Sequence, residues 1–153
     1  MRIEDEIHQK NFSSEWHKLH VNILFTASWI GQKSLSVLKP FGISRQQFNI
    51  LRILKGRFPE PASVKLISER MIDKMSNTSR LIEKLKSKNL VDRYECPEDR
   101  RQVNVIISVK GMDLIEKAGL AMEKYMDHTI KNLNETEAVA LNILLDRFRE
   151  EKN

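Results

Sequence analysis

The stretch that decides the fold is residues 76–91, which read SNTSRLIEKLKSKNLV. Four of its positions follow the i, i+3, i+4, i+7 spacing of one helix face. These inward positions are Thr78, Leu81, Ile82 and Leu85. Asn89 tolerates the left-handed backbone conformation that ends many helices, and the hydrophobic period changes after it. The stretch therefore predicts an amphipathic helix that ends near Asn89 and leads directly into a β-strand.

Two β-strands are predicted after this helix. Residues 90–96 and 102–108 have the strand pattern, and the second of them is rich in β-branched side chains. The residues between them, 97–101, read PEDRR and favour a turn. This part of the chain therefore predicts a two-stranded hairpin.

Two shorter helices are predicted before residue 76. Ser44 and Gln47 have the spacing of a capping box, and Ser63 can cap the second helix. The side chains expected to be buried are Phe48, Leu51, Leu54 and Phe58 in the first helix and Val64, Ile67 and Met71 in the second. Three short helices followed by a hairpin are typical of a winged helix-turn-helix, so the predicted fold is mainly α with a small β-wing.

Long helices are predicted on both sides of this lobe. The first runs from about Glu4 to Lys39, and Ser13 or Ser14 can cap it after an interruption. The last begins at Asn134, which has the capping-box spacing with Glu137. The apolar residues of the first helix occupy more than one side, which indicates a second partner, and another copy of the chain is the simplest source. We therefore expect one chain, 1–153, in which dimerisation helices at 1–40 and 110–150 flank a DNA-binding lobe at 44–109.

The positive charge of the chain is concentrated in this lobe. The whole chain has a formal net charge of +5. Residues 44–109 hold 14 Lys and Arg against 8 Asp and Glu, a balance of +6, and the rest hold 12 against 13, a balance of −1. A basic centre between near-neutral ends favours a polyanion bound by the middle of the chain. The alternative is a solvated helix face with surplus lysine.

The outward face of the helix at 76–88 is the first predicted contact with DNA. Small hydroxyl and amide side chains at its start permit close approach to base edges, and an arginine can fork onto guanine or phosphate. The predicted contact residues are Ser76, Asn77, Thr78, Ser79, Arg80 and Lys84, with Lys84, Lys86 and Lys88 directed to phosphates. The alternative is an ordinary amphipathic helix whose Ser and Asn serve only as caps.

The hairpin turn is the second predicted contact. Arg100 and Arg101 lie at its apex, where a cation can enter the narrow and electronegative minor groove, and Asp99 can orient one of them. A lone turn of this kind is more often a solvated loop. Its position shortly after a polar-faced helix favours a surface in which both elements reach one duplex.

The chain resembles the MarR (multiple antibiotic resistance regulator) family of transcription factors. The resemblance covers most of the chain, and the motifs that carry it are FGISRQQFNILRIL from Phe41, ISERM from Ile67, SNTSRLIEKLKSKNLV from Ser76, PEDRRQVNV from Pro97 and SVKG from Ser108. It departs from the family at Asn89, where a glycine is common.

The resemblance implies roles that the residues alone do not. Asp99 and Arg101 match the Asp-x-Arg pattern of the family wing, in which the arginine enters the minor groove and the aspartate supports it. Family members are homodimers that mostly repress transcription until a small aromatic or amphipathic compound, or an oxidant, releases them. By fold-level analogy, a ligand pocket is expected near Trp16, His20 and Phe48.

Other classes of function are disfavoured by the sequence. No phosphate loop or nucleophile–base pair is recognisable, so we expect no enzyme and no cofactor. His8, His17 and His20 lack the further ligands of a metal site, and Cys96 is expected to be a passive strand residue. The N-terminus lacks a basic, apolar leader and no run spans a membrane, so a cytoplasmic protein with no membrane partner is expected. The main alternative function is a winged-helix protein-assembly module without operator specificity.

Overall fold

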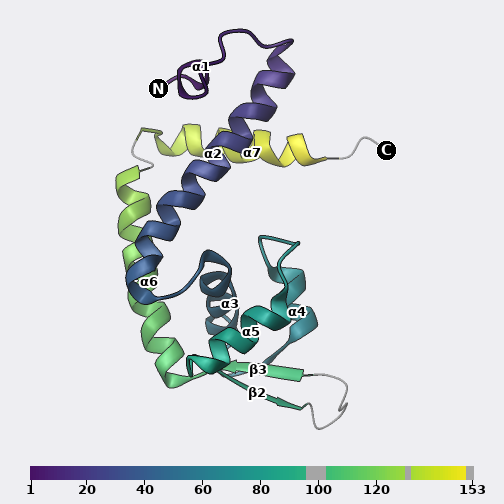
Figure 1. Cartoon of the computed structure of the whole chain (residues 1–153), viewed down its shortest axis with the longest axis vertical. Helices are drawn as coiled ribbons and strands as arrows, with labels where there is room; N and C mark the ends of the chain where they lie inside the picture. Colours follow the sequence, from purple (N-terminus) through teal and green to yellow (C-terminus); the bar gives the residue numbers. More distant parts are fainter. Residues whose placement is uncertain (96–102, 130–131, 151–153) are drawn as a thin grey trace.

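The computed structural model describes residues 1–95, 103–129 and 132–150. Its elements in chain order are α1 (Ile3–Glu6), α2 (Glu15–Leu38), η1 (Lys39–Phe41), α3 (Arg45–Lys55), β1 (Ala62–Ser63), α4 (Val64–Arg70), α5 (Thr78–Ser87), β2 (Val91–Glu95), β3 (Val103–Ile107), α6 (Val109–Thr129) and α7 (Glu135–Arg149). The chain is mainly helical with one small antiparallel sheet (Figure 1), which confirms the predicted fold class.

Side-chain caps define where the helices begin. At α3 the Ser44 hydroxyl accepts from the Gln47 N–H and the Gln47 side chain accepts from the Ser44 N–H, both at 3.1 Å. Asn134 and Glu137 form the same reciprocal pair at α7. Ser14 caps α2 and Ser63 caps α4. These caps satisfy amide groups that the first helical turn leaves without partners, and they confirm the predicted helix starts.

The junction between α5 and β2 is built on Asn89. Its φ of 59° is left-handed, as predicted. The Asn89 N–H donates to the Lys86 carbonyl at 2.8 Å and the Leu90 N–H donates to the Leu85 carbonyl at 3.0 Å, the pattern of a Schellman cap. The Ser108 hydroxyl donates to the Asn89 carbonyl at 2.8 Å. The end of α5 is thereby tied to the start of α6.

The sheet has three strands in the order β1-β3-β2, where the sequence predicted only a hairpin. β2 and β3 pair antiparallel from Val91 opposite Ile107 to Glu95 opposite Val103, as expected. β1 adds Ala62 opposite Val105 on the other edge of β3. A strand of two residues has no detectable alternation, so only its distant partner in β3 defines it.

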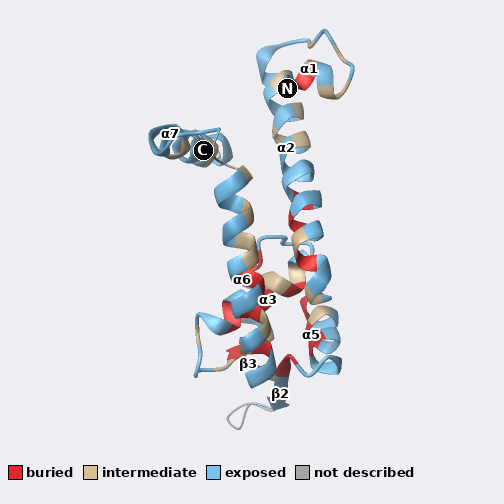
Figure 2. Cartoon of the chain, turned by 90° about the vertical axis from the view of Figure 1, so that its left-hand side faces the viewer, coloured by how far each residue is buried: buried red, intermediate tan, exposed pale blue. Residues whose placement is uncertain are grey.

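The hydrophobic core lies inside the winged-helix lobe (Figure 2). Its fully buried side chains include Ile50, Leu51 and Leu54 from α3, Ile67 from α4, Ile82 and Leu85 from α5, Val105 from β3 and Ile115 from α6. The prediction of a buried Phe58 is wrong, because α3 ends at Lys55 and the Phe58 side chain, beyond the helix, is 54% exposed. Phe48 is only half-buried against this core.

Helices α2 and α7 contribute little to the core of a single chain. In α2 only Gly31, Ser34 and Leu38, near its C-terminal end, are buried, and α7 has no buried residue. Large apolar side chains exposed on α2 are Trp16, Leu19, Leu24, Trp29, Ile30 and Leu35, and those on α7 are Val139, Leu141, Ile143, Leu144 and Phe148. In Figure 2, α7 and the N-terminal part of α2 extend away from the lobe.

Within the described ranges, no helix combines the length and apolar character needed to cross a membrane.

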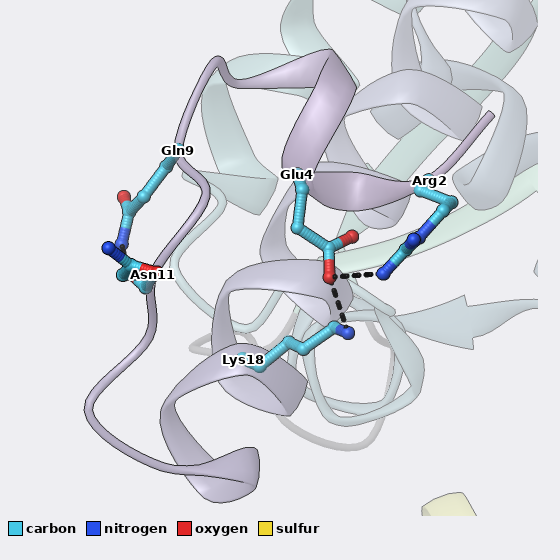
Figure 3. Close-up of polar contacts among 5 residues, drawn as sticks. All are labelled: Arg2, Glu4, Gln9, Asn11 and Lys18. Atoms are coloured by element: carbon cyan, nitrogen blue, oxygen red, sulfur yellow. Dashed lines mark hydrogen bonds and ion pairs between the residues drawn. The ribbon is translucent and has the colours of Figure 1, made fainter.

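An ion-pair cluster fastens the N-terminal helix α1 to α2 (Figure 3). The Glu4 carboxylate lies 2.6 Å from the Lys18 ammonium and 3.1 Å from the Arg2 guanidinium. The hydrogen bond from Lys18, followed by the backbone N–H of Glu4 and the charge of Arg2, lowers the pKa of Glu4 from 4.5 to about 2. Ile3, beside this carboxylate, is buried.

This cluster predicts an acid-sensitive attachment of α1. Because the folded pKa of Glu4 is depressed, its contribution is complete above pH 4.5 and is lost as the pH falls towards 2. The protection factors of residues 3–7, which correct the exchange rates for the intrinsic pH dependence of amide exchange, should therefore fall through this interval in the wild type. Glu4→Gln should show low protection factors at every pH and no such transition. Equal pH profiles for the two proteins would refute the role of the cluster.

Candidate nucleic-acid interface

Helix α5 presents a polar face because the other face is anchored in the core. Ile82 and Leu85 are fully buried, whereas Ser79, Arg80 and Lys84 are exposed. Among the described residues, the Arg80 guanidinium has no hydrogen-bond or ion-pair partner. Side chains of the exposed face are therefore free to meet a ligand that approaches α5 from solvent.

The start of α5 is capped by one of the predicted contact residues. The Asn77 side-chain oxygen accepts from the Arg80 N–H at 3.0 Å. The Asn77 side chain remains exposed, so its amide NH₂ can still donate to a partner. Free N–H groups and the dipole give a helix start partial positive charge, which favours an approaching anion.

Among the predicted contacts, Thr78 requires correction and Lys88 has a partner within the chain. Thr78 is only 5% exposed, and its hydroxyl has no hydrogen-bond partner in the described part of the chain. It lies on the inward face of α5, so its side chain cannot reach a base from this position. The Lys88 ammonium donates to the Gly42 carbonyl at 2.6 Å, which ties α5 to the turn before α3. An ammonium has three donors, so its role at a phosphate stays a prediction.

A shallow hollow brings the other helix residues together. It has a volume of about 350 Å³ and is lined by Gln46, Asp73, Ser76, Asn77, Arg80 and Lys84. Gln46 and Asp73 were missed in the sequence, although Gln46 lies on the outward side of α3 beside the recognised capping box. The Ser76 hydroxyl, followed by the Met75 N–H and the Gln46 amide, lowers the pKa of Asp73. The Ser76 Oγ is buried and meets no partner at hydrogen-bond geometry in the described part of the chain, so this hydroxyl, like that of Thr78, is not presented to DNA.

The hairpin is fastened to α5 by an ion pair between Arg93 of β2 and Glu83 of α5. In Figure 1, the free ends of β2 and β3 point to the right at the bottom of the lobe, and the loop that joins α4 to α5 lies above α5. The predicted wing residues Asp99, Arg100 and Arg101, and the Cys96 thiol, lie outside the described residues.

The three residues predicted to bind an effector are not brought together within one chain. Arg45 of α3, one turn before Phe48, packs against Gly31 of α2. Trp16 lies fifteen residues before Gly31, which is about 22 Å along a helix. His20 lies on the same distant part of α2. Trp16, His20 and Phe48 therefore do not line one pocket within a single protomer.

A different cavity lies between the lobe and the long helices. It has a volume of about 590 Å³ and is lined by Arg52 and Lys55 of α3 and by Glu116, Gly119 and Leu120 of α6, among others. Lys55 and Glu116 form an ion pair at 3.5 Å across it. The sequence offered no signal for this cavity, because its walls come from helices more than 60 residues apart.

His17, one of the three N-terminal histidines, contacts its own helix start. Its Nδ1 lies 3.1 Å from the Ser13 hydroxyl, and its ring meets that of Phe12 edge to face at 5.5 Å. Across residues 1–95, 103–129 and 132–150, no three His, Cys, Asp or Glu side chains gather as potential metal ligands.

Comparisons with known proteins agree with this geometry. The sequence model of the MarR family matches residues 43–103. The HTH-type transcriptional repressor IacR of Pseudomonas putida is 26% identical over 142 residues, which cover 93% of this chain and 80% of IacR.

Solved structures show the same fold. A MarR-like transcription regulator from Bacillus cereus superposes with a TM-score of 0.79 at 20% identity and covers 89% of this chain and 96% of its own. A MarR variant from E. coli, in complex with operator DNA, has a TM-score of 0.77 at 21% identity and covers 92% of this chain and 100% of its own.

Proposed function

We propose that the chain is a member of the MarR family of winged helix-turn-helix transcription regulators, whose sequence model matches residues 43–103, and that it is a homodimeric repressor of one specific DNA operator, released by a small molecule. Members of this family are regulators and not enzymes. The proposed function implies that the chain works in the cytoplasm, where bacterial DNA lies.

The observation that carries the proposal is the exposed start of α5. Asn77, Ser79 and Arg80 project from a helix whose opposite face is fixed in the core. Arg80 and Asn77 have the donor geometry that reads guanine and adenine edges, and Lys84 and Lys86 add positive charge for phosphates. We propose that this helix enters the major groove and that Arg101, supported by Asp99, enters the minor groove.

The homodimer is proposed from the exposed apolar faces of α2 and α7. A leucine, an isoleucine and a phenylalanine exposed together on α7 are costly in water unless another surface covers them. A second copy offers the same faces in return, as a two-fold interface requires. We propose that residues 1–40 and 110–150 form this interface, outside the DNA-binding lobe at 44–109.

The cavity between α3 and α6 is the proposed effector site. Its lining carries two cations, Arg52 and Lys55, two carboxylates, Glu116 and Glu123, and the apolar side chain of Leu120. An amphipathic aromatic acid would fit this chemistry with its carboxylate taking the place of Glu116 beside Lys55. Because α6 continues from β3 through Ser108, a ligand that separates α3 from α6 would change the spacing of the two recognition helices.

A panel of aromatic acids tests this site. A compound that releases the wild-type protein from DNA should lose its effect on Lys55→Ala, whose DNA affinity without ligand should remain normal. Release of Lys55→Ala and wild type at equal concentrations would move the effector site elsewhere.

Selection from a randomised duplex library tests the function itself. A DNA-reading dimer should enrich one operator with two half-sites and bind it on the order of a thousandfold more tightly than a scrambled duplex. Its affinity should fall steeply between about 50 and 200 mM salt. An assembly module that docks an acidic partner would enrich no operator, and that result would replace the proposal.

Arg80 and Lys86 should separate base reading from phosphate binding. Arg80→Ala is expected to cost about 1–3 kcal/mol on the selected operator and to relax the preference at one base pair. Lys86→Ala should weaken operator and scrambled duplex alike and reduce the salt slope by about one. Gel-shift titrations on both duplexes distinguish these effects. Equal losses for the two variants on both duplexes would contradict this division of roles.

A further inference from the structure

An unusually exposed apolar side chain stands at the start of the recognition helix. Met75 is 93% exposed and immediately precedes Ser76 and the cap Asn77. The side chains around the nearby hollow are polar or charged apart from Leu81. A methionine in full contact with water at this position gains nothing from the fold of the chain.

The backbone that presents Met75 is fixed. The Met75 N–H donates to the Asp73 carboxylate at 3.1 Å, and the Ser76 N–H donates to the Asp73 carbonyl at 3.2 Å. Further back, the Ile72 N–H donates to the Asn49 side chain of α3 at 2.9 Å. Ile72 is also exposed, but it lies five residues before the cap and beside α3. Met75 is therefore held next to the first turn of α5.

The charge around Met75 indicates what covers it. Lys74 precedes it, and in the lining of the adjacent hollow two cations, Arg80 and Lys84, outnumber the one carboxylate, Asp73. A polyanion is the partner that such cations attract. In the major groove of DNA, the apolar group that a base pair presents is the C5-methyl group of thymine. An apolar side chain beside cations at a recognition helix therefore matches a thymine flanked by phosphates.

We propose that Met75 contacts a thymine methyl group in each operator half-site and so determines specificity at that position. The proposal rests on the proposed DNA-binding function. It adds an apolar contact to the polar contacts of Asn77 and Arg80.

Deoxyuridine substitution tests the contact, because it removes only the methyl group. The probe is the duplex selected by the full-length chain, with each thymine replaced in turn. Replacement of one particular thymine in each half-site is expected to weaken wild-type binding about fourfold, because the contact loses the burial of one methyl-sized apolar group. Met75→Ser should bind the thymine and uracil duplexes equally, and Met75→Leu should restore the difference.

Val109→Ser is the matched control, because Val109 is 90% exposed at the start of α6, where β3 ends away from the hairpin. It should retain the wild-type ratio. An unchanged ratio in Met75→Ser would overturn the contact, as would a selected operator without a thymine whose replacement matters. In either case wild-type binding to the operator leaves the proposed function intact, whereas failure to select any operator removes both.

Discussion

Replacing Leu141 with glutamate is expected to separate the dimer and to weaken binding to an operator of two half-sites by on the order of 100-fold or more. Leu141 is exposed in the single chain, on the apolar stripe of α7 that also carries Leu144 and Phe148. In the proposed dimer the new carboxylate would be buried without a partner. Each monomer would then bind one half-site alone, without the second site held at high effective concentration.

Sedimentation measures the first effect and gel-shift titration the second. Asn142→Glu is the matched control, because it places the same charge on the neighbouring position outside the stripe. It should remain dimeric and bind normally. Since Leu141 is not part of the core, the circular dichroism of Leu141→Glu should match that of the wild type. A Leu141→Glu protein that is dimeric and binds with full affinity would exclude α7 from the interface.

Gly111→Ala is expected to lower the free energy of unfolding by roughly 3 kcal/mol, the upper part of the range for overpacking a core. A Cβ at this position would lie 2.0 Å from the Leu90 carbonyl oxygen and 2.9 Å from Ile107 Cγ1. The Leu90 carbonyl cannot move freely, because it accepts from the Ser108 N–H at 3.1 Å. The Ser108 hydroxyl in turn caps the Gly111 N–H at 3.0 Å. The substitution therefore separates β2 from α6.

Denaturant unfolding at one fixed protein concentration measures this loss, since a dimer's stability depends on concentration. Gly119→Ala is the control in the same helix, because a Cβ there meets no atom within 4 Å. It should be neutral or add up to about 1 kcal/mol through helix propensity. Equal stability of the two variants would mean that β2 and α6 do not pack as described.

Local signals predicted most of the fold. The capping boxes at Ser44 and Asn134 and the left-handed Asn89 are set by residues within one turn of each other. The buried stripe of α5 follows from its own period, and the structure confirms it at Ile82 and Leu85. These features depend on short stretches, which the sequence presents directly.

Features that depend on distant partners could not be predicted in the same way. β1 is defined only by its pairing with β3. The requirement for glycine at position 111 arises only because the Leu90 carbonyl oxygen lies where a Cβ would be. The spacing predicts Phe58 on the buried stripe of α3, but α3 ends at Lys55. The sequence predicts Thr78 both on the inward face of α5 and among the DNA contacts. The side chain is buried, so the inward position is correct. The effector trio does not meet within one protomer, because Trp16 and His20 lie far along α2 from the part of it that packs against α3, which carries Phe48.

The proposed mode of DNA recognition requires that a homodimer places two copies of α5 on one duplex. Hydroxyl-radical footprinting of the wild-type chain on its selected operator measures this geometry. We expect two protected tracts on one face of the duplex, with centres one helical turn, about 34 Å, apart. A single protected tract, or protection that is uniform along the duplex, would contradict the account.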